Sequence, residues 1–93
     1  MNTILLVEDS ETIIMGLQYS LQQEGFYVKI AKSIESALKE NDYDLVLLDI
    51  TLPDGNGFEL FEKIKKKNNI PVIFLTARDE ELNVVKGLDL GAE

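Results

Sequence analysis

Apolar and polar residues follow two alternating spacings along this chain. Uninterrupted apolar runs at residues 4–7, 45–48 and 72–75 predict β-strands with both faces buried, and residues 26–30 alternate as an edge strand does. Each run is followed by a segment with the helical spacing. The apolar positions of these four segments are Ile13, Ile14, Leu17 and Leu21; Ile34, Ala37 and Leu38; Phe58, Phe61 and Ile64; and Leu82, Val85 and Leu88.

Residues at the ends of the predicted elements agree with this division. Gly25 is predicted to end the first helix and Ser33 to cap the second, while Lys65–Lys67 place positive charge at the end of the third. Pro71 precedes the fourth strand. The order βαβαβαβα predicts an α/β fold with a doubly wound parallel sheet and helices on both faces. In such sheets, ligands bind at the carboxyl ends of the strands.

Three acids and a hydroxyl stand at those strand ends. Glu8 and Asp9 follow the first strand, Asp49 ends the third, and Thr76 follows the fourth. If these strands are neighbours, the carboxylates converge, repel one another and raise one another's pKa. A hard cation with oxygen ligands relieves this repulsion, and Mg²⁺ fits best because it also leaves positions open for phosphate oxygens.

Each of these residues also has a purely structural interpretation. A single acid after a strand is usually a solvated loop residue or a helix cap, and either Asp9 or Ser10 could cap the first helix. Residues 53–57 would pass as an ordinary turn. Lys65–Lys67 are best explained as a solvated helix end. The acids are of interest jointly, because the topology places them in one crevice.

Composition narrows the classes of function. The 93 residues predict one domain, and 17 acidic against 9 basic residues give a net charge of −8, which disfavours nucleic acids and anionic membranes as partners. The chain has no cysteine and no histidine, so thiolate sites and imidazole acid–base chemistry are excluded. Neither a phosphate-binding glycine loop nor a dinucleotide fingerprint is present. No signal peptide or membrane span is recognised, so a cytoplasmic protein is expected.

Four stretches of sequence together resemble the receiver domain of a two-component response regulator. They are "ILLVEDS", "DLVLLDITLPDGNGFEL", "IPVIFLTA" and "GLDLGAE", and the resemblance covers the whole chain. It is strongest to receivers followed by a winged-helix DNA-binding domain. The resemblance implies a flavodoxin-like sheet with strand order 2-1-3-4, and a receiver domain at residues 1–93 that lacks the fifth strand and fifth helix of the family.

The resemblance also assigns roles to residues. It implies that Asp49 accepts a phosphoryl group from a sensor histidine kinase and that Mg²⁺ is the cofactor. Asp9, Asp49 and the backbone carbonyl of Thr51 would hold the metal, with Glu8 orienting its water shell. The Thr76 hydroxyl, as a switch, and the Ala77 backbone N–H would receive phosphoryl oxygens. The chain would then be no enzyme beyond its own phosphorylation and dephosphorylation, and its output would be transcription regulation.

Two features depart from the family pattern. Many relatives have methionine where this chain has Thr51, beside the site. The family's phosphate-pairing lysine is also missing, and we expect none of the lysines present to lie at a strand's carboxyl end. One face of the sheet, over the strand at 72–75, is expected to lack a covering helix. Copies are therefore predicted to associate through that strand and face.

Two other functions stay open. A phosphatase or phosphotransferase with an aspartyl nucleophile is one, although the haloacid dehalogenase type requires an acid where Thr51 stands. A pseudo-receiver that binds partners without phosphate is the other. The set formed by Glu8, Asp9, Asp49 and Thr76 disfavours it, and the missing lysine favours it.

Overall fold

The computed structural model describes residues 2–67 and 69–75. Its elements, in chain order, are β1 (Thr3–Val7), α1 (Glu11–Gln23), β2 (Tyr27–Ala31), α2 (Ile34–Leu38), β3 (Leu45–Asp49), β4 (Thr51–Leu52), β5 (Gly55–Asn56), α3 (Gly57–Lys67) and β6 (Val72–Leu75). Thr76, the expected switch residue, Ala77, the expected N–H donor to the phosphoryl group, and the predicted last helix lie outside the described residues.

Four of the strands form one parallel sheet in the order β2-β1-β3-β6. Because β6 is the fourth strand predicted from the sequence, this confirms the expected order 2-1-3-4. The register pairs Val7 with Leu48 and Asp49 with Leu75, so the carboxyl ends of the three neighbouring strands are nearly level.

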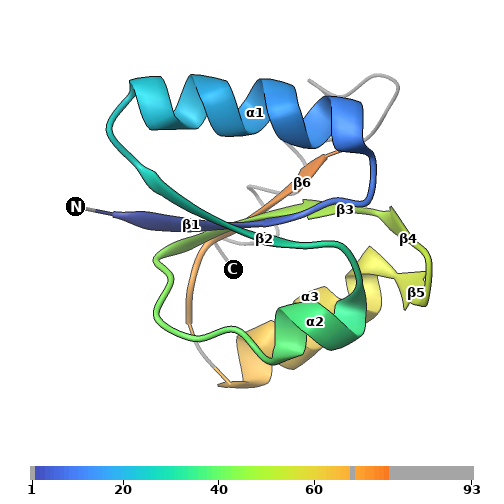
Figure 1. Ribbon diagram of the computed structural model, residues 1–93. Coiled ribbons are helices and arrows are strands. Elements are labelled where there is room, and N and C mark those ends of the chain that lie inside the picture. The colour runs from blue at the N-terminus through green and yellow to red at the C-terminus, as the bar shows by residue number, and fades with distance from the viewer. Residues whose placement is uncertain (1, 68, 76–93) are drawn as a thin grey trace.

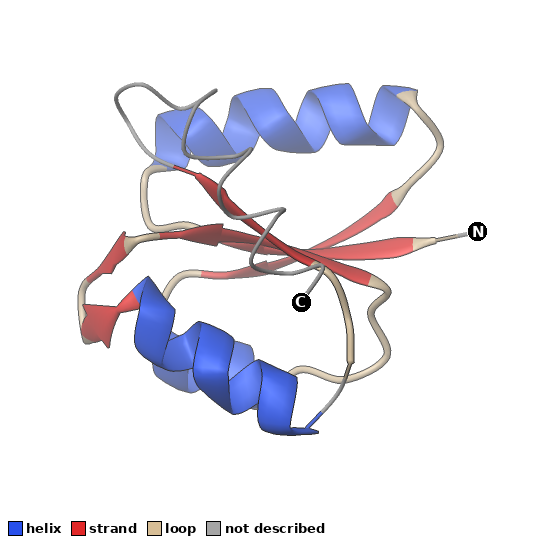
Figure 2. Cartoon of the chain, turned by 180° about the vertical axis from the view of Figure 1, so that it is seen from behind, coloured by secondary structure: helices blue, strands red, loops and turns tan. Residues whose placement is uncertain are grey.

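Helices cover both faces of this sheet, with α1 on one side and α2 and α3 on the other (Figure 1). The view from behind shows the same two layers around the strands (Figure 2). Strand order reverses after β2, and right-handed crossovers then send the connecting helices to opposite faces. Within the described residues, no helix combines the length and apolarity needed to cross a bilayer.

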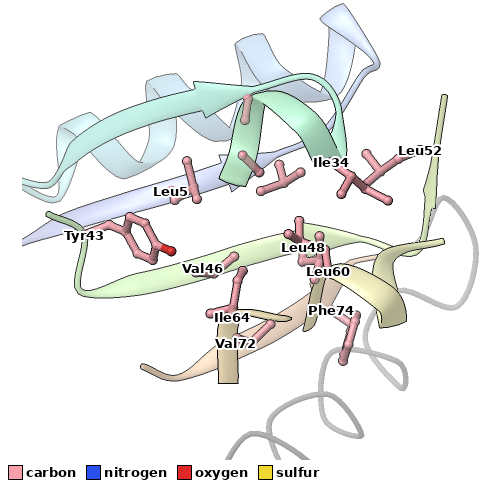
Figure 3. Packing of buried hydrophobic residues seen from close by; sticks show 13 residues of the cluster. Leu5, Ile34, Tyr43, Val46, Leu48, Leu52, Leu60, Ile64, Val72 and Phe74 are labelled. Carbon is pink, nitrogen blue, oxygen red and sulfur yellow. The ribbon is translucent and has the colours of Figure 1, made fainter. Parts of the chain in front are cut away.

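The uninterrupted apolar runs are explained by these two layers. On β1, Leu5 and Val7 pack into the cluster beneath α2 and α3, while Ile4 and Leu6 pack into the cluster beneath α1. Figure 3 shows the larger cluster, in which Leu48, Leu60 and Phe74 meet from β3, α3 and β6. Its full set of buried residues is Leu5, Val7, Ala31, Ile34, Ala37, Tyr43, Val46, Leu48, Leu52, Leu60, Ile64, Val72 and Phe74.

The two faces of β6 differ in burial. Val72 and Phe74 are buried on the side of α2 and α3, whereas Ile73 and Leu75, on the side of α1, are only half-buried. This difference has the direction expected from a face that, among the described residues, one helix covers. Association of copies through this face stays a prediction.

The helix ends follow the sequence signals. Ser10, rather than Asp9, caps α1 by accepting the Ile13 N–H, and Ser33 caps α2 in a reciprocal pair with Ser36. Gly25 follows α1 with a φ of 93°, a conformation that favours glycine.

Three local details go beyond or differ from the sequence patterns. Residues 53–57 are more than a turn, because the short strands β4 and β5 pair there and α3 already begins at Gly57. Phe58 does not lie on the buried face of α3, where Leu60 is fully buried; Phe58 is 43% exposed and its ring contacts Phe74 at a centroid distance of 4.7 Å. Finally, β2 extends to Ala31, so Lys32 does follow a strand's carboxyl end, where it forms an ion pair with Glu11.

Candidate functional site

Three carboxylates gather at the carboxyl ends of the two central strands. Glu8 and Asp9 follow β1, Asp49 is the last residue of β3, and one oxygen from each lies within 4.8 Å of those of the other two. The parallel pairing of β1 with β3 brings them together, as the sequence predicted. Burial differs within the group: Glu8 is buried, Asp49 is half-buried and Asp9 is exposed.

Glu8 is a buried carboxyl group beside a second acid. Its side chain is 3% exposed, its backbone N–H donates to the Ala31 carbonyl at 3.0 Å, and its Oε2 accepts the Ser10 N–H at 3.0 Å. Loss of hydration, opposed by the Ser10 bond and reinforced by nearby Asp49, raises the pKa of Glu8 to about 7. The interaction between the two side chains also raises the pKa of Glu8 and lowers that of Asp49.

Asp49 is also shifted toward its neutral form. Burial is the main cause that raises the pKa of the Asp49 carboxyl group, and the charge of Asp9 adds to it. The Thr51 N–H, which donates to Asp49 Oδ1 over 3.4 Å, acts in the opposite direction and also fixes the direction in which the carboxylate points. Thr51 itself is exposed at the start of β4.

The backbone after Asp49 is held by an unusually close approach of α3. The Gly57 N–H donates to the Ile50 carbonyl at 2.6 Å, and a Cβ at Gly57 would lie 2.2 Å from the backbone oxygen of Asp49. Only glycine fits this position without a shift of the strand end. Asn56 completes the helix start, because its Oδ1 accepts the Phe58 N–H at 2.7 Å.

This arrangement suits a divalent cation with oxygen ligands. All donors of the group are carboxylate oxygens, and the raised pKa values of Glu8 and Asp49 reflect a cost that a bound cation removes. Exposed Asp9 leaves the group open to solvent on one side, as a metal that keeps water ligands requires. The residues present therefore fit Mg²⁺.

The site contains two residues whose roles sequence reasoning missed. Gly57 was noted only as part of a family pattern, and its close contact with Asp49 depends on where α3 starts. Asp54 was taken as a turn residue, yet its carboxylate accepts two N–H groups from α2. No local signal reveals that contact, because the partners are about 20 residues apart in the chain.

Comparison with known proteins places the chain in one family. It matches the response regulator receiver domain over residues 4–93. The transcriptional regulatory protein AfsQ1 of Streptomyces coelicolor is 41% identical over 96 residues, which include all of this chain and 43% of that protein. The chain thus spans less than half the length of that relative.

Solved structures give the same result. The response regulator TrrA of Thermotoga maritima, in complex with Mg²⁺ and BeF, has a TM-score of 0.80 at 40% identity; the match covers 85% of this chain and 72% of that one. TrrA in complex with the histidine kinase ThkA has a TM-score of 0.77 at 41% identity, with coverage of 83% and 70%.

Proposed function

The chain belongs to the response regulator receiver domain family, and on this premise we propose that Asp49 is the phosphoacceptor of a two-component signalling protein. One observation supports it most directly: Asp49, at the carboxyl end of β3, lies within 4.8 Å of carboxylate oxygens from both Glu8 and Asp9. The family is one of signalling proteins rather than enzymes, which agrees with a single phosphorylation event.

In this proposal, an oxygen of Asp49 attacks the phosphorus atom of a phosphohistidine. The new O–P bond forms as the P–N bond breaks, and the electron pair of that bond returns to the imidazole nitrogen. Bound Mg²⁺ would supply positive charge against the charge that develops on the phosphoryl oxygens. Asp9 and Asp49 would bind the metal through carboxylate oxygens, Thr51 through its backbone carbonyl, and Glu8 through the metal's water shell.

The sheet contributes rigidity to this reaction. Leu48, immediately before Asp49, is fully buried, and Gly57 packs against the backbone oxygen of Asp49 itself. Phosphoryl transfer depends on holding the nucleophile in line, and this packing fixes its direction. Thr76 and Ala77 are proposed to receive phosphoryl oxygens, and the step that follows is a switch of the Thr76 hydroxyl.

A sensor histidine kinase is the proposed phosphodonor, and the similarity to TrrA supports it because that protein is bound to a histidine kinase in the structure named above. The proposed output is transcription regulation through a winged-helix DNA-binding domain of a longer protein, supported by the similarity to AfsQ1.

The proposal is tested by labelling the full-length protein with acetyl phosphate in MgCl₂. We expect Asp49→Asn to abolish labelling, because it removes the nucleophile, and EDTA to abolish it in the native protein. Asp42→Asn is the matched control: Asp42 is exposed before β3 and has a φ of 62°, which asparagine tolerates. Labelling of Asp49→Asn at the native rate, with the phosphate on another residue, would contradict the assignment.

A further inference from the structure

Asp54, at the tip of the β4–β5 hairpin, joins the loop after Asp49 to a helix elsewhere in the sequence. Its Oδ1 accepts the Ile34 N–H at 2.8 Å, and its Oδ2 accepts the Glu35 N–H at 3.0 Å. One carboxylate thus binds the first two N–H groups of α2. The Ile34 and Glu35 N–H groups hold the pKa of Asp54 below its usual range. The carboxylate that makes this contact is therefore ionised at pH 7.

The N-terminus of α2 is complete only with this contact. Ser33 Oγ accepts the Ser36 N–H at 3.1 Å, and the Ser33 carbonyl accepts the Ala37 N–H at 3.1 Å. The two N–H groups that precede these in the helix, those of Ile34 and Glu35, are the ones that Asp54 accepts. A helix of five residues has little stability of its own, so its position depends on such contacts.

An apolar contact lies beside the polar one. Ile34 is 7% exposed, and a Cβ at Gly55 would lie 2.7 Å from Ile34 Cδ1, so the hairpin backbone rests directly on this side chain. Ile34 and Leu52 belong to the same buried cluster and lie at its hairpin end (Figure 3). The hairpin is therefore attached to α2 at two points.

The segment held in this way contains Thr51, whose backbone carbonyl is proposed above as a metal ligand. At its base, the Gly57 N–H closes the loop by donating to the Ile50 carbonyl. At its tip, Asp54 is fixed to α2. Thr51 lies between these two attachments and donates its own N–H to Asp49.

We propose that Asp54 is a positioning residue, whose carboxylate clamps the hairpin to α2 and thereby holds the Thr51 carbonyl and the Asp49 carboxylate in place for the metal. The metal part of this statement rests on the proposed function, and the clamp itself rests on the contacts above. Asp54 does not belong to the metal-binding group, so its effect on the metal is transmitted through the loop.

The experiment compares two ways of weakening the same helix end in the full-length protein. Asp54→Ala removes the acceptors for Ile34 and Glu35 and releases the hairpin. Ser33→Ala removes the acceptor for Ser36 and leaves the hairpin bonds untouched, so it is the matched control for damage to α2 alone. Asp54→Asn keeps one acceptor oxygen and is the milder variant if Asp54→Ala does not fold.

Two readouts come from one ¹⁵N-labelled sample of each variant. A MgCl₂ titration followed by amide chemical shifts gives metal affinity, and hydrogen exchange of the Gly57 amide reports closure of the loop base. We expect Asp54→Ala to bind Mg²⁺ roughly tenfold more weakly, the low end for loss of a group that orients a ligand. The Gly57 amide should exchange faster, with Asp54→Asn intermediate and Ser33→Ala like the native protein on both readouts.

Three results would overturn the clamp: native behaviour of Asp54→Ala on both readouts, faster Gly57 exchange with unchanged Mg²⁺ affinity, or equal losses in Ser33→Ala. A native protein that binds no Mg²⁺ would instead contradict the proposed function. Hydrogen exchange of the Gly57 amide would then test the clamp by itself. If this amide exchanged at the native rate in Asp54→Ala, the clamp would be rejected.

Discussion

The two ends of β3 each present an aspartate, and their surroundings could hardly differ more. At the amino end, Asp44 is exposed and its Oδ2 accepts the Thr3 N–H at 2.8 Å. At the carboxyl end, Asp49 is half-buried, lies beside Glu8 and Asp9, and accepts the Thr51 N–H over a long distance of 3.4 Å. Asp44 satisfies a backbone donor at the start of a neighbouring strand. Asp49 adds a third carboxyl group to a place that already holds two.

This difference separates a structural carboxylate from a chemical one within a single strand. Asp44 stabilises the fold, because its hydrogen bond links β1 to the start of β3. Burial beside other acids makes the charged form of Asp49 costly, and such a cost is expected where a protein maintains a site for a cation or a reaction. Residue type alone does not distinguish the two; the direction of the strand does, because ligands bind at carboxyl ends in parallel sheets.

The largest effect on stability is expected from adding a methyl group beside the carboxyl end of β3. Gly57→Ala places Cβ against the backbone oxygen of Asp49, so either α3 or the end of β3 must shift. We expect a loss of about 2–3 kcal/mol in the free energy of unfolding, together with loss of phosphorylation. Urea unfolding and acetyl phosphate labelling check the two parts.

Gly16→Ala is the control for Gly57→Ala. Gly16 lies within α1, and a Cβ there would have nothing within 4 Å. Alanine is the better helix former, so the free energy of unfolding of this variant should rise by about 0.5–1 kcal/mol. Equal effects of the two substitutions would show that the close approach at Asp49 is unimportant.

The next largest effect is expected in the pH dependence of stability, which should depend on the acids at the carboxyl end of β3 and not on Asp44 at its amino end. Glu8 has its pKa raised from 4.5 to about 7 by burial. Between these values the folded protein holds a proton that the unfolded chain has lost, so the free energy of unfolding of the metal-free protein should fall as pH rises through this window. For a side chain this buried, the change is on the order of 2–3 kcal/mol.

Glu8→Gln should remove most of that pH dependence and stabilise the metal-free protein at pH 8. Asp44→Asn, at the other end of the strand, should leave it intact. Thermal melts from pH 4.5 to 8 in EDTA give both results. A native protein with flat stability across this range would contradict the raised pKa.

The smallest effect is expected at Asp9. Because its charge disfavours ionisation of both Glu8 and Asp49, Asp9→Asn should stabilise the metal-free fold. The gain should be below about 1 kcal/mol, since Asp9 is exposed and solvent screens it. Mg²⁺ affinity should fall at the same time, because a proposed ligand is lost. Melts with and without MgCl₂ measure both, and unchanged affinity would rule out Asp9 as a ligand.

The sequence was sufficient for the sheet and for the convergence of the acids. An uninterrupted apolar run such as Leu45–Leu48 is buried on both faces only inside a parallel sheet. Strand direction then determines where Glu8 and Asp49 meet. These inferences use regular periods and general rules of topology. They require no knowledge of individual contacts.

The region after Asp49 was the part that sequence patterns did not predict. β4 and β5 have two residues each, too few for any period to appear. The role of Asp54 depends on α2 lying beside the hairpin in space. Phe58 has the spacing of a core residue and is still exposed, because an aromatic residue at helical spacing is buried only where a neighbouring layer covers it.

The central place of β1 in the sheet has a consequence for the order of folding. Thr3 pairs with Tyr27 on one side, and Ile4 pairs with Leu45 on the other. The second loop is less than twice as long as the first, and even a doubling of loop length costs only about 0.6 kcal/mol in closure entropy. Chain entropy therefore gives β2 little advantage as the first partner of β1. β3 is the more apolar of the two, so we expect folding to start with the pairing of β1 and β3. The strand that carries the proposed phosphoacceptor would then be in place before the edge strand β2 joins the sheet.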